Sequence, residues 1–528
     1  MSACRSCCAV ALLSVYAVVA LAAMMHVPAD LPTIQSALDS IADQDTVLVA
    51  DGLYPEALLA PPLKFWLLGD VPVDTGDFVR PIIDASFLPD SVGRGCFTLV
   101  AGSYAQVERF RFRNHSGALP PPSTAFGVVL HGDSASFQDC AFDSVISSLH
   151  HGQHEPQVYV KLDRCVFRYY VSDVILPATQ VWATDCYFTD KENGDVQLVC
   201  GAHSLVENCR FDHTRWSFLA TGGPDITVRN CIFGPSVPQL QQSITLGHYS
   251  VRFVNNLLTD LQGLTHMLRV DPDSLGGTVI DSNTFVNCHR IATSNTTLIY
   301  ICTFDGQPVT AAYEVAYNTM VQCSTGSVAR AISARGPGTF IGNRIHDLAN
   351  PAWPAIVFTG DDSARFTNNV IYNTGFAMRC DDAQLPVDAK FNWWGDSTGP
   401  YHPTLNPDGL GDQVGNNITF IPWSPDTSFL SVSDFRRPLP EQFVLEAYPN
   451  PFNSTVTLKL IPPDAMIVRV ELFDILGRRI KELWSGPLAF EKQVSFDGSE
   501  LASGIDFVRV WQPIGNRQLA LKKLVLLK

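Results

Sequence analysis

Short stretches in which apolar and polar residues alternate follow one another along most of the chain. One pattern, apolar–x–x–Cys–x–Phe, occurs as FQDCAF (137–142), LDRCVF (162–167), VENCRF (206–211) and VRNCIF (228–233). The alternation has a period of two, and no apolar stripe with the 3.6-residue period of a helix accompanies it. The pattern therefore predicts short β-strands that are separated by tight corners.

The cysteine position of this pattern continues along the chain with other residues in its place. The series is Phe110, Cys140, Cys165, Cys186, Cys209, Cys231, Asn256, Asn283, Asn318, Asn343, Asn369 and Asn392. Most spacings lie in the twenties, which indicates the coils of a solenoid whose turns accept insertions. A second short strand recurs between the markers, as in GVVL (127–130), DVQLV (195–199), SITL (243–246) and PAIVF (354–358). Several short strands in each coil predict a parallel β-helix.

Stacking explains why one column holds first cysteines and then asparagines. Equivalent side chains of successive coils lie about 4.8 Å apart, directly over one another. Asparagine at a corner can bond the backbone and its copies above and below, and a small buried cysteine fills the same space as an apolar residue. Metal binding or redox chemistry by the stacked thiols is the alternative, but buried cysteines in apolar surroundings are inert.

The N-terminal residues predict export. Arg5 precedes an apolar run (9–23) that is too short to span a bilayer comfortably, and Ala-Leu-Ala at 20–22 fits the cleavage rule of a signal peptide, here 1–23. Retention of this run as a membrane anchor is the alternative. No later stretch approaches twenty apolar residues, so we expect no transmembrane segment in the mature chain. Eleven of the 14 cysteines would remain, an odd and scattered set that is no disulfide framework.

Charge divides the chain into two parts and excludes one class of partner. Residues 24–440 contain 24 basic and 42 acidic residues, whereas residues 441–528 contain 11 and 10. A body with this negative balance repels nucleic acid, so we expect no nucleic-acid partner. Neutral glycans meet no such obstacle, and acidic polysaccharides would need local arginines or bridging cations.

The two ends of the repeat region resemble the right-handed parallel β-helix superfamily with the pectate-lyase-like fold. HVPADLPTIQSALDSIADQDTVLVADGLYPEAL (26–58) is similar to the start of bacterial members, and its apolar residues at helical spacing predict a short capping helix. NWWGDSTGPYHPTLNPDGLGDQVGNNITFIPW (392–423) is similar to their closing segment, where Trp393 and Trp394 would cover the last coil. We therefore expect a right-handed single-stranded parallel β-helix over 24–425, and we expect it to be monomeric.

A second unit follows a linker at 426–442. The segment 443–528 contains YPNPFN, DILGR, FDGSELASG and a terminal lysine, and its alternation predicts about seven strands in a small sandwich. It resembles the immunoglobulin-like C-terminal sorting domain of type IX secretion cargo. Asp506 departs from that pattern, because an aromatic residue commonly stands there. The resemblance implies a Gram-negative bacterium, the type IX secretion machinery as partner, and a protein that is secreted or held on the outer cell surface.

A protein of this fold that acts on polysaccharide would use outward residues of neighbouring coils. We expect the second short strand of each coil, which follows the corner strand, to line a groove. Its outward residues are then His131, Lys161, His248, Arg269, Asp271, Arg330, Arg379 and Asp381. A lyase needs carboxylates to hold calcium and an arginine or lysine to remove a proton, which Arg269 with Asp271 and Arg379 with Asp381 would supply. A hydrolase needs two carboxylates, and Asp361 and Asp362 lie one coil before Asp381. No ordered polygalacturonase motif accompanies them.

The histidines of HHGQHE (150–155) are the densest metal-like cluster. His150, His151 and His154 could hold zinc or copper, although their spacing matches no established ligand pattern and a polar insertion explains them equally. No cofactor is evident otherwise, except the calcium that a lyase would use. Two functions therefore stay open: a surface β-helix that binds polysaccharide or serves as adhesin or scaffold, and a polysaccharide lyase or glycoside hydrolase.

Overall fold

The computed structural model describes residues 22–429 and 443–528, with internal gaps. The gaps are 72–79, 87–94, 114–125, 132–133, 144–146, 151–158, 169–173, 177–179, 190–195, 214–216, 237–243, 248–249, 264–265, 273–276, 291–295, 303–308, 324–328, 349–352, 360–363, 382–385, 462–465, 489–491, 500 and 513–516. Residues 1–21 of the predicted signal peptide and 430–442 of the predicted linker thus lie outside the described residues. No helix in the described part of the chain is long and apolar enough to span a membrane.

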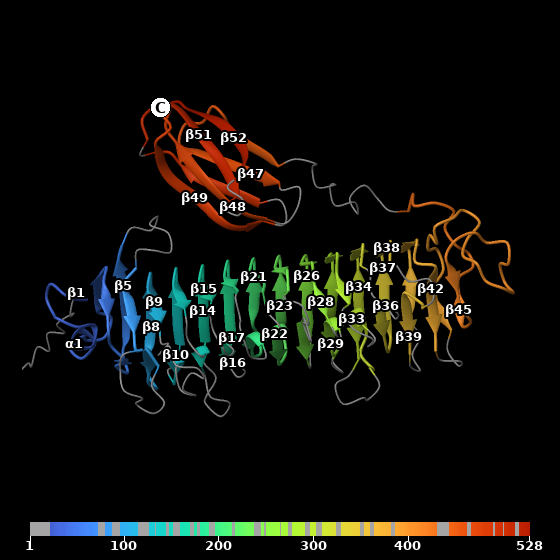
Figure 1. The fold of residues 1–528 in the computed structure, drawn as a ribbon, viewed down its shortest axis with the longest axis horizontal. Coiled ribbons are helices and arrows are strands. Elements are labelled where there is room, and N and C mark those ends of the chain that lie inside the picture. Colours follow the sequence, from blue (N-terminus) through green and yellow to red (C-terminus); the bar gives the residue numbers. More distant parts are fainter. Residues whose placement is uncertain are drawn as a thin grey trace, which may run out of the picture.

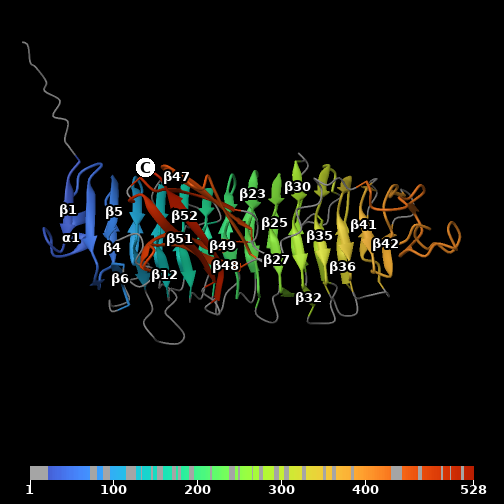
Figure 2. The ribbon, with the colours of Figure 1, turned by 90° about the horizontal axis from the view of Figure 1, so that it is seen from above.

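Three long parallel sheets form the body, and each coil of the chain contributes a strand to them in turn (Figures 1 and 2). The strands of sheet A, in spatial order, are β1 (Met24–Val27), β2 (Thr46–Ala50), β5 (Lys64–Asp70), β8 (Tyr104–Glu108), β11 (Ser134–Gln138), β14 (Tyr159–Asp163), β17 (Gln180–Thr184), β20 (Leu205–Glu207), β23 (Ile226–Arg229), β26 (Val251–Val254), β30 (Thr278–Asp281), β34 (Tyr313–Ala316), β37 (Gly338–Ile341), β40 (Arg365–Thr367), β43 (Val387–Asp388) and β45 (Ile418–Thr419).

Sheet B follows sheet A across the marker corner. Its strands are β3 (Leu53–Tyr54), β6 (Ile82–Asp84), β9 (Arg111–Arg113), β12 (Ala141–Asp143), β15 (Val166–Arg168), β18 (Tyr187–Phe188), β21 (Arg210–Phe211), β24 (Ile232–Phe233), β27 (Leu257–Thr259), β31 (Thr284–Val286), β35 (Thr319–Val321), β38 (Arg344–His346) and β41 (Val370–Tyr372). The short strands β28 (Gln262–Gly263) and β32 (His289–Arg290) pair beside it.

Sheet C closes each coil. Its strands are β4 (Leu58–Ala60), β7 (Phe97–Leu99), β10 (Phe126–Leu130), β13 (Ser147–His150), β16 (Val174–Leu176), β19 (Val196–Cys200), β22 (Ser217–Gly222), β25 (Ile244–Gly247), β29 (His266–Val270), β33 (Thr296–Ile301), β36 (Ala329–Ala334), β39 (Ile356–Phe358), β42 (Phe376–Cys380) and β44 (Gln413–Val414). The chain is thus a right-handed parallel β-helix, as its repeat predicted.

The corner between sheets A and B is made by two residues, and the second is the marker of the repeat. The first adopts a left-handed backbone, as Asn230 (φ 57°) and Asn255 (φ 58°) do, and asparagine tolerates this conformation. From Asn256 onward, each marker backbone N–H donates to Oδ1 of the next asparagine at 2.8–3.0 Å. The predicted asparagine ladder is therefore present, and it begins where Cys231 N donates to Asn256 Oδ1.

Cysteines and phenylalanines fill the core. All eleven cysteines after residue 23 are described, buried and free of disulfides, and desolvation raises the pKa of the Cys140 and Cys165 thiols well above the ordinary value. Phenylalanines of sheet B stack coil upon coil with centroids 4.6–5.1 Å apart, and they are Phe112, Phe142, Phe167, Phe188, Phe211 and Phe233. This environment makes the thiols structural, as the sequence indicated.

Both ends of the core are covered. At the first coil lies α1 (Ile34–Leu38), which buries Ile34, Ala37 and Leu38, and Glu56 accepts hydrogen bonds from the first two helical N–H groups at 3.0 and 2.9 Å. At the last coil, Trp394 is fully buried. These covers occupy the edges of the sheets, where an open β-helix would otherwise pair with another chain.

The C-terminal unit consists of two antiparallel sheets around their own core. One sheet contains β46 (Val444–Tyr448), β47 (Thr455–Ile461) and β50 (Lys492–Asp497); the other contains β49 (Arg479–Leu488), β48 (Met466–Phe473), β51 (Gly504–Gln512) and β52 (Arg517–Leu526). Two of its sequence motifs have clear structural roles. Asn450 of YPNPFN bonds the backbone of Lys523 and Val525 on β52, and Asp474 of DILGR fixes a turn by accepting from the N–H groups of Leu476 and Arg478.

Candidate functional site

Arginine, tyrosine and histidine side chains stand on the outer side of the C-terminal half of sheet C, where Ser333 and Val357 between them are buried. In its register, one column contains Arg269, Tyr300, Ser333, Val357 and Arg379 on successive strands. The residues on either side of Arg269, Leu268 and Val270, belong to the core, so this column points away from it. A second column aligns His266, Thr297 and Arg330. We call the surface of His266, Arg269, Tyr300, Arg330, Arg335 and Arg379 the basic face.

Like charges lie close together on this face. Burial is the largest cause that lowers the pKa of His266, to about 4, and repulsion by Arg269 and Arg330 adds to it. Burial likewise lowers the pKa of Arg330, and the neighbouring Arg379 lowers it further, while Asp381 and Tyr300 oppose this effect. Among the described residues, the buried Nε of Arg330 has no hydrogen-bond partner. The face therefore holds positive charge that nearby carboxylates compensate only in part.

Two carboxylates border the basic face in different ways. Asp381 holds Arg379 in a bidentate pair, with Nε–Oδ1 at 2.5 Å and Nη2–Oδ2 at 3.1 Å. Asp271 is buried just after β29, and its backbone N–H donates to Leu246 O at 3.0 Å. Asp381 therefore compensates the charge of Arg379, and Asp271 is largely shielded from solvent.

The two predicted arginine–aspartate pairs, which the structure describes, lie far apart. Arg269 belongs to β29 and Arg379 to β42, and Asp271 and Asp381 directly follow these strands. The strands β33, β36 and β39 lie between them. Four strand spacings of about 4.8 Å separate the two pairs by about 19 Å. Paired carboxylates that cleave a glycosidic bond stand about 5–10 Å apart. Asp271 and Asp381 therefore cannot serve one bond together.

Other predicted site residues lie outside the described residues. These are His248, Asp361, Asp362, His151, His154 and the side chain of His150, whose backbone ends β13. Within the parts of the chain that the structure describes, no group of three histidine, cysteine or acidic residues is placed to hold a metal ion. Calcium, zinc and copper binding remain predictions.

The structure also corrects one predicted position and adds two residues. Lys161 lies on β14 of sheet A and not on a strand of sheet C, because it stands four residues before the marker Cys165, on the strand that enters the corner. His266 and Arg335 belong to the basic face but did not stand out in the sequence. Two consecutive core residues, Met267 and Leu268, interrupt the alternation between His266 and Arg269. A repeated pair of adjacent apolar residues is the signal that locates these outward positions.

The fold and its C-terminal unit define an exported β-helix protein. Residues 446–526 match the family described as the secretion system C-terminal sorting domain. The chain therefore carries a type IX sorting domain, and the protein is secreted or lies on the outer cell surface of a Gram-negative bacterium. A search of curated proteins finds no match.

Solved structures similar to this chain are also parallel β-helix proteins. A tailspike protein of an E. coli bacteriophage shares 10% identity, with 87% of this chain and 82% of that chain covered and a TM-score of 0.37. The catalytic domain of a GH87 alpha-1,3-glucanase shares 10% identity over 68% of this chain and 66% of that chain, with a TM-score of 0.34. Pectin methylesterase PemA from Erwinia chrysanthemi shares 13% over 47% and 80%, with a TM-score of 0.27. Likenesses at this level carry no functional inference.

Proposed function

We propose that this exported β-helix binds a polysaccharide that carries anionic groups, and that the basic face holds those groups. The observation that carries the proposal is Arg330, a half-buried guanidinium whose neighbours include further arginines and whose Nε lacks a hydrogen-bond partner among the described residues. A carboxylate or sulfate group would supply both the charge and the acceptor that this site lacks.

The spacing of the arginines suits an extended ligand. Arg269, Arg330 and Arg379 lie on β29, β36 and β42, so two strand spacings, about 10 Å, separate each from the next along the rod. A polymer with charges at regular intervals can contact all three, whereas a small anion would contact one. The body is negative overall, so an anionic ligand should be attracted where arginines outnumber carboxylates, as they do on this face.

Binding accounts for the geometry better than cleavage does. Arg379 is engaged by Asp381, and the carboxylates at the two ends of the face are too far apart to flank one glycosidic bond. A lyase or hydrolase remains the alternative function, and it would require groups beyond these two pairs. The role of adhesin or scaffold on the cell surface follows naturally from a rod that binds glycan without turnover.

The test is a binding screen with the purified exported chain. Uronate-containing, sulfated and neutral polysaccharides are compared at low and high salt, with and without calcium. We expect retention of anionic glycans that weakens as salt rises. Equal retention of neutral glycans, or none of any anionic glycan, would overturn the proposal. Absorbance of unsaturated ends and assay of reducing ends in the same samples would reveal cleavage and replace binding with catalysis.

A further inference from the structure

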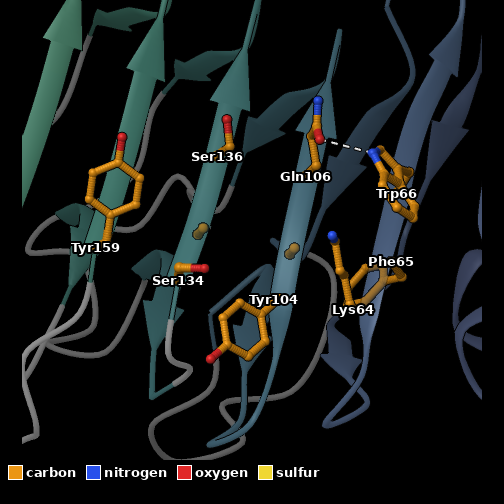
Figure 3. A pocket seen from close by; sticks show the side chains of 10 residues that line it. Lys64, Phe65, Trp66, Tyr104, Gln106, Ser134, Ser136 and Tyr159 are labelled. Carbon is orange, nitrogen blue, oxygen red and sulfur yellow. Dashed lines mark hydrogen bonds between the residues drawn. The ribbon is translucent and has the colours of Figure 1, made fainter. Parts of the chain in front are cut away.

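A second surface, on sheet A, has a different chemistry from the basic face. Near the N-terminal end, four aromatic side chains stand on the outward positions of β5, β8, β14 and β17, and they are Trp66, Tyr104, Tyr159 and Trp182. Together with Lys64, Gln106, Ser134 and Ser136, the first three line an open hollow of about 270 Å³ (Figure 3). We call this surface, including the neighbouring Trp182, the aromatic groove.

Strand register places the aromatic residues in two adjacent columns that run along the sheet. Trp66 and Trp182 share a column with Gln106 and Ser136, and four strand spacings, about 19 Å, separate the two indoles. Tyr104 and Tyr159 share the adjacent column two spacings apart. Between them β11 presents only serines, and this small residue type creates the hollow between the two phenol rings, as Figure 3 shows.

The side chains of the groove are held in place by one another. Trp66 Nε1 donates to Gln106 Oε1 at 2.8 Å, and Gln106 Nε2 donates to Glu108 Oε1 at 3.1 Å. At the other end, Tyr159 packs edge-to-face on Trp182 with centroids 5.6 Å apart. These contacts order the rings before any ligand arrives, which lowers the entropy lost on binding.

Large aromatic surface nevertheless stays in contact with water. Tyr104 is 46% exposed and Trp182 is 43% exposed, which is unusual for side chains that gain so much from burial. Cations and carboxylates balance along the groove: Lys64 lies in the column of the tyrosines and Lys161 in that of the tryptophans, while Glu108 and Asp163 lie in the next column. The groove therefore offers flat apolar faces and neutral hydrogen-bonding groups without a dominant charge.

We propose that the aromatic groove is a second carbohydrate site, and that it takes a neutral glycan chain running along the rod. Sugar rings present an apolar face to an aromatic ring and hydroxyl groups at their rim. The indole of Trp182 and the phenol of Tyr104 provide stacking surfaces, while Gln106, Ser134 and Ser136 exchange hydrogen bonds with hydroxyls. The hollow is smaller and more open than a pocket that encloses a whole ligand, so it suits a segment of a longer chain.

This site is independent of the basic face and uses a different sheet. A rod with both sites would connect an anionic polysaccharide to a neutral one. The proposed function at sheet C can fail while this inference holds, and the reverse is also true, because the two ligands differ in charge.

The experiment is calorimetric titration of the purified exported chain with hexasaccharides of β-1,4-glucan, β-1,3-glucan and β-1,4-xylan, with an oligouronate alongside. We expect at least one neutral hexasaccharide to bind, with little dependence on salt. Trp182→Ala and Tyr104→Ala should each weaken that binding by about tenfold. Trp353→Ala, which removes an indole of 38% exposure before β39, should leave it unchanged. Thermal unfolding of all variants confirms that they fold.

Radical footprinting of the unaltered chain gives a second, mutation-free result. A bound neutral hexasaccharide should protect Tyr104, Tyr159 and Trp182 from oxidation. If only the oligouronate binds, the proposal for the aromatic groove is wrong and the proposal for the basic face is unaffected. Binding of neutral glycan without protection of these rings would overturn it too. The same holds if Trp182→Ala converts a dimer to a monomer in sedimentation, since the occupant would then be a second copy of the chain.

Discussion

The imidazole of His266 lies against the ring of Tyr300, with centroids 4.0 Å apart and planes inclined by 18°. The two residues belong to neighbouring strands of sheet C, and Arg269 and Arg330 stand next to them in register. A neutral imidazole stacks there without adding to the positive charge of the arginines. Protonation would place a third cation in the same partly buried patch.

His266 should make the stability of the β-helix depend on pH. Its pKa is about 4 in the folded chain against 6.5 ordinarily, so between these values the unfolded chain binds a proton that the folded chain does not. The free energy of unfolding then falls as pH falls through this window, by up to about 3 kcal/mol. His266→Phe keeps a stacked ring and removes the titration. Urea unfolding should show that the difference between variant and original chain grows in the variant's favour from pH 6.5 to 4; a constant difference contradicts this.

Arg330 should be the main determinant of anionic-glycan binding on the basic face. Arg330→Gln removes the guanidinium while preserving most of the side-chain volume. Loss of one charge-assisted contact should weaken binding of an oligouronate by about tenfold or more and reduce its salt dependence. Calorimetry at two salt concentrations measures both. Arg365→Gln is the matched control, because Arg365 is an exposed arginine on β40 of sheet A; equal losses in the two variants would assign the effect to net charge.

The asparagine ladder should contribute far more per residue than the cysteine column. Asn318 Oδ1 accepts from Asn283 N and Nδ2, and its own Nδ2 donates to the carbonyls of Ile280 and Ala316. Asn318→Ala leaves several buried groups without partners and should lower the free energy of unfolding by about 3 kcal/mol or more. Cys209→Ala removes one buried sulfur and should lower it by about 1 kcal/mol. Similar losses measured by urea unfolding would mean that the ladder is packing alone.

The thiols should be unreactive in the folded protein. All eleven cysteines after residue 23 are buried, and desolvation raises the pKa of Cys96 and of Cys200 to about 12. A chromogenic disulfide reagent at neutral pH should label none of them until denaturant is added, and then all eleven. Rapid labelling of one or more thiols in native buffer, with the unfolding rate measured separately, would falsify this expectation.

Asp506 should destabilise the sorting domain at neutral pH. Burial is the first cause that raises its pKa, and Asp474 adds to the effect. A raised pKa means that the folded domain disfavours the carboxylate, so ionisation weakens the domain as pH rises above the unfolded value. Asp506→Asn should raise the melting temperature of the C-terminal domain at pH 7, and the gain should shrink in mild acid. A gain that does not change with pH would point to hydrogen bonding instead of charge.

The architecture could be predicted from the sequence because the same short pattern recurs in successive coils. The marker series from Phe110 to Asn392 identifies the corners between sheets A and B from β8 onward, and the stacked coils turn that period into ladders of asparagine and phenylalanine. Part of the C-terminal unit is equally readable, since Asp474 fixes a turn by local bonds, whereas Asn450 bonds the distant strand β52. The information for the corners and for the Asp474 turn is contained within one coil or one turn.

The candidate sites depend on which residues of successive coils lie side by side, and this register cannot be read directly from the sequence. Trp66, Tyr104, Tyr159 and Trp182 come from strands that are separated by insertions of different length, so nothing along the chain places them in two adjacent columns. Arg269, Arg330 and Arg379 were predicted to face outward, but their spacing along the rod follows from the strand order alone. The separation of the two arginine–aspartate pairs, which argues against a shared catalytic centre, could likewise not be seen.

The asparagine ladder gives the rod a polarity. Each asparagine donates its backbone N–H toward the coil that follows and offers its Oδ1 to the coil that precedes, up to Asn392. Removal of coils from the N-terminal end leaves the Oδ1 of the first remaining asparagine without a donor. Removal from the C-terminal end leaves the buried backbone N–H of the last remaining asparagine without an acceptor, which should destabilise the β-helix more. A chain made from its N-terminus thus completes each coil only when the next one arrives. The last coil, which supplies Asn392, therefore closes the whole series.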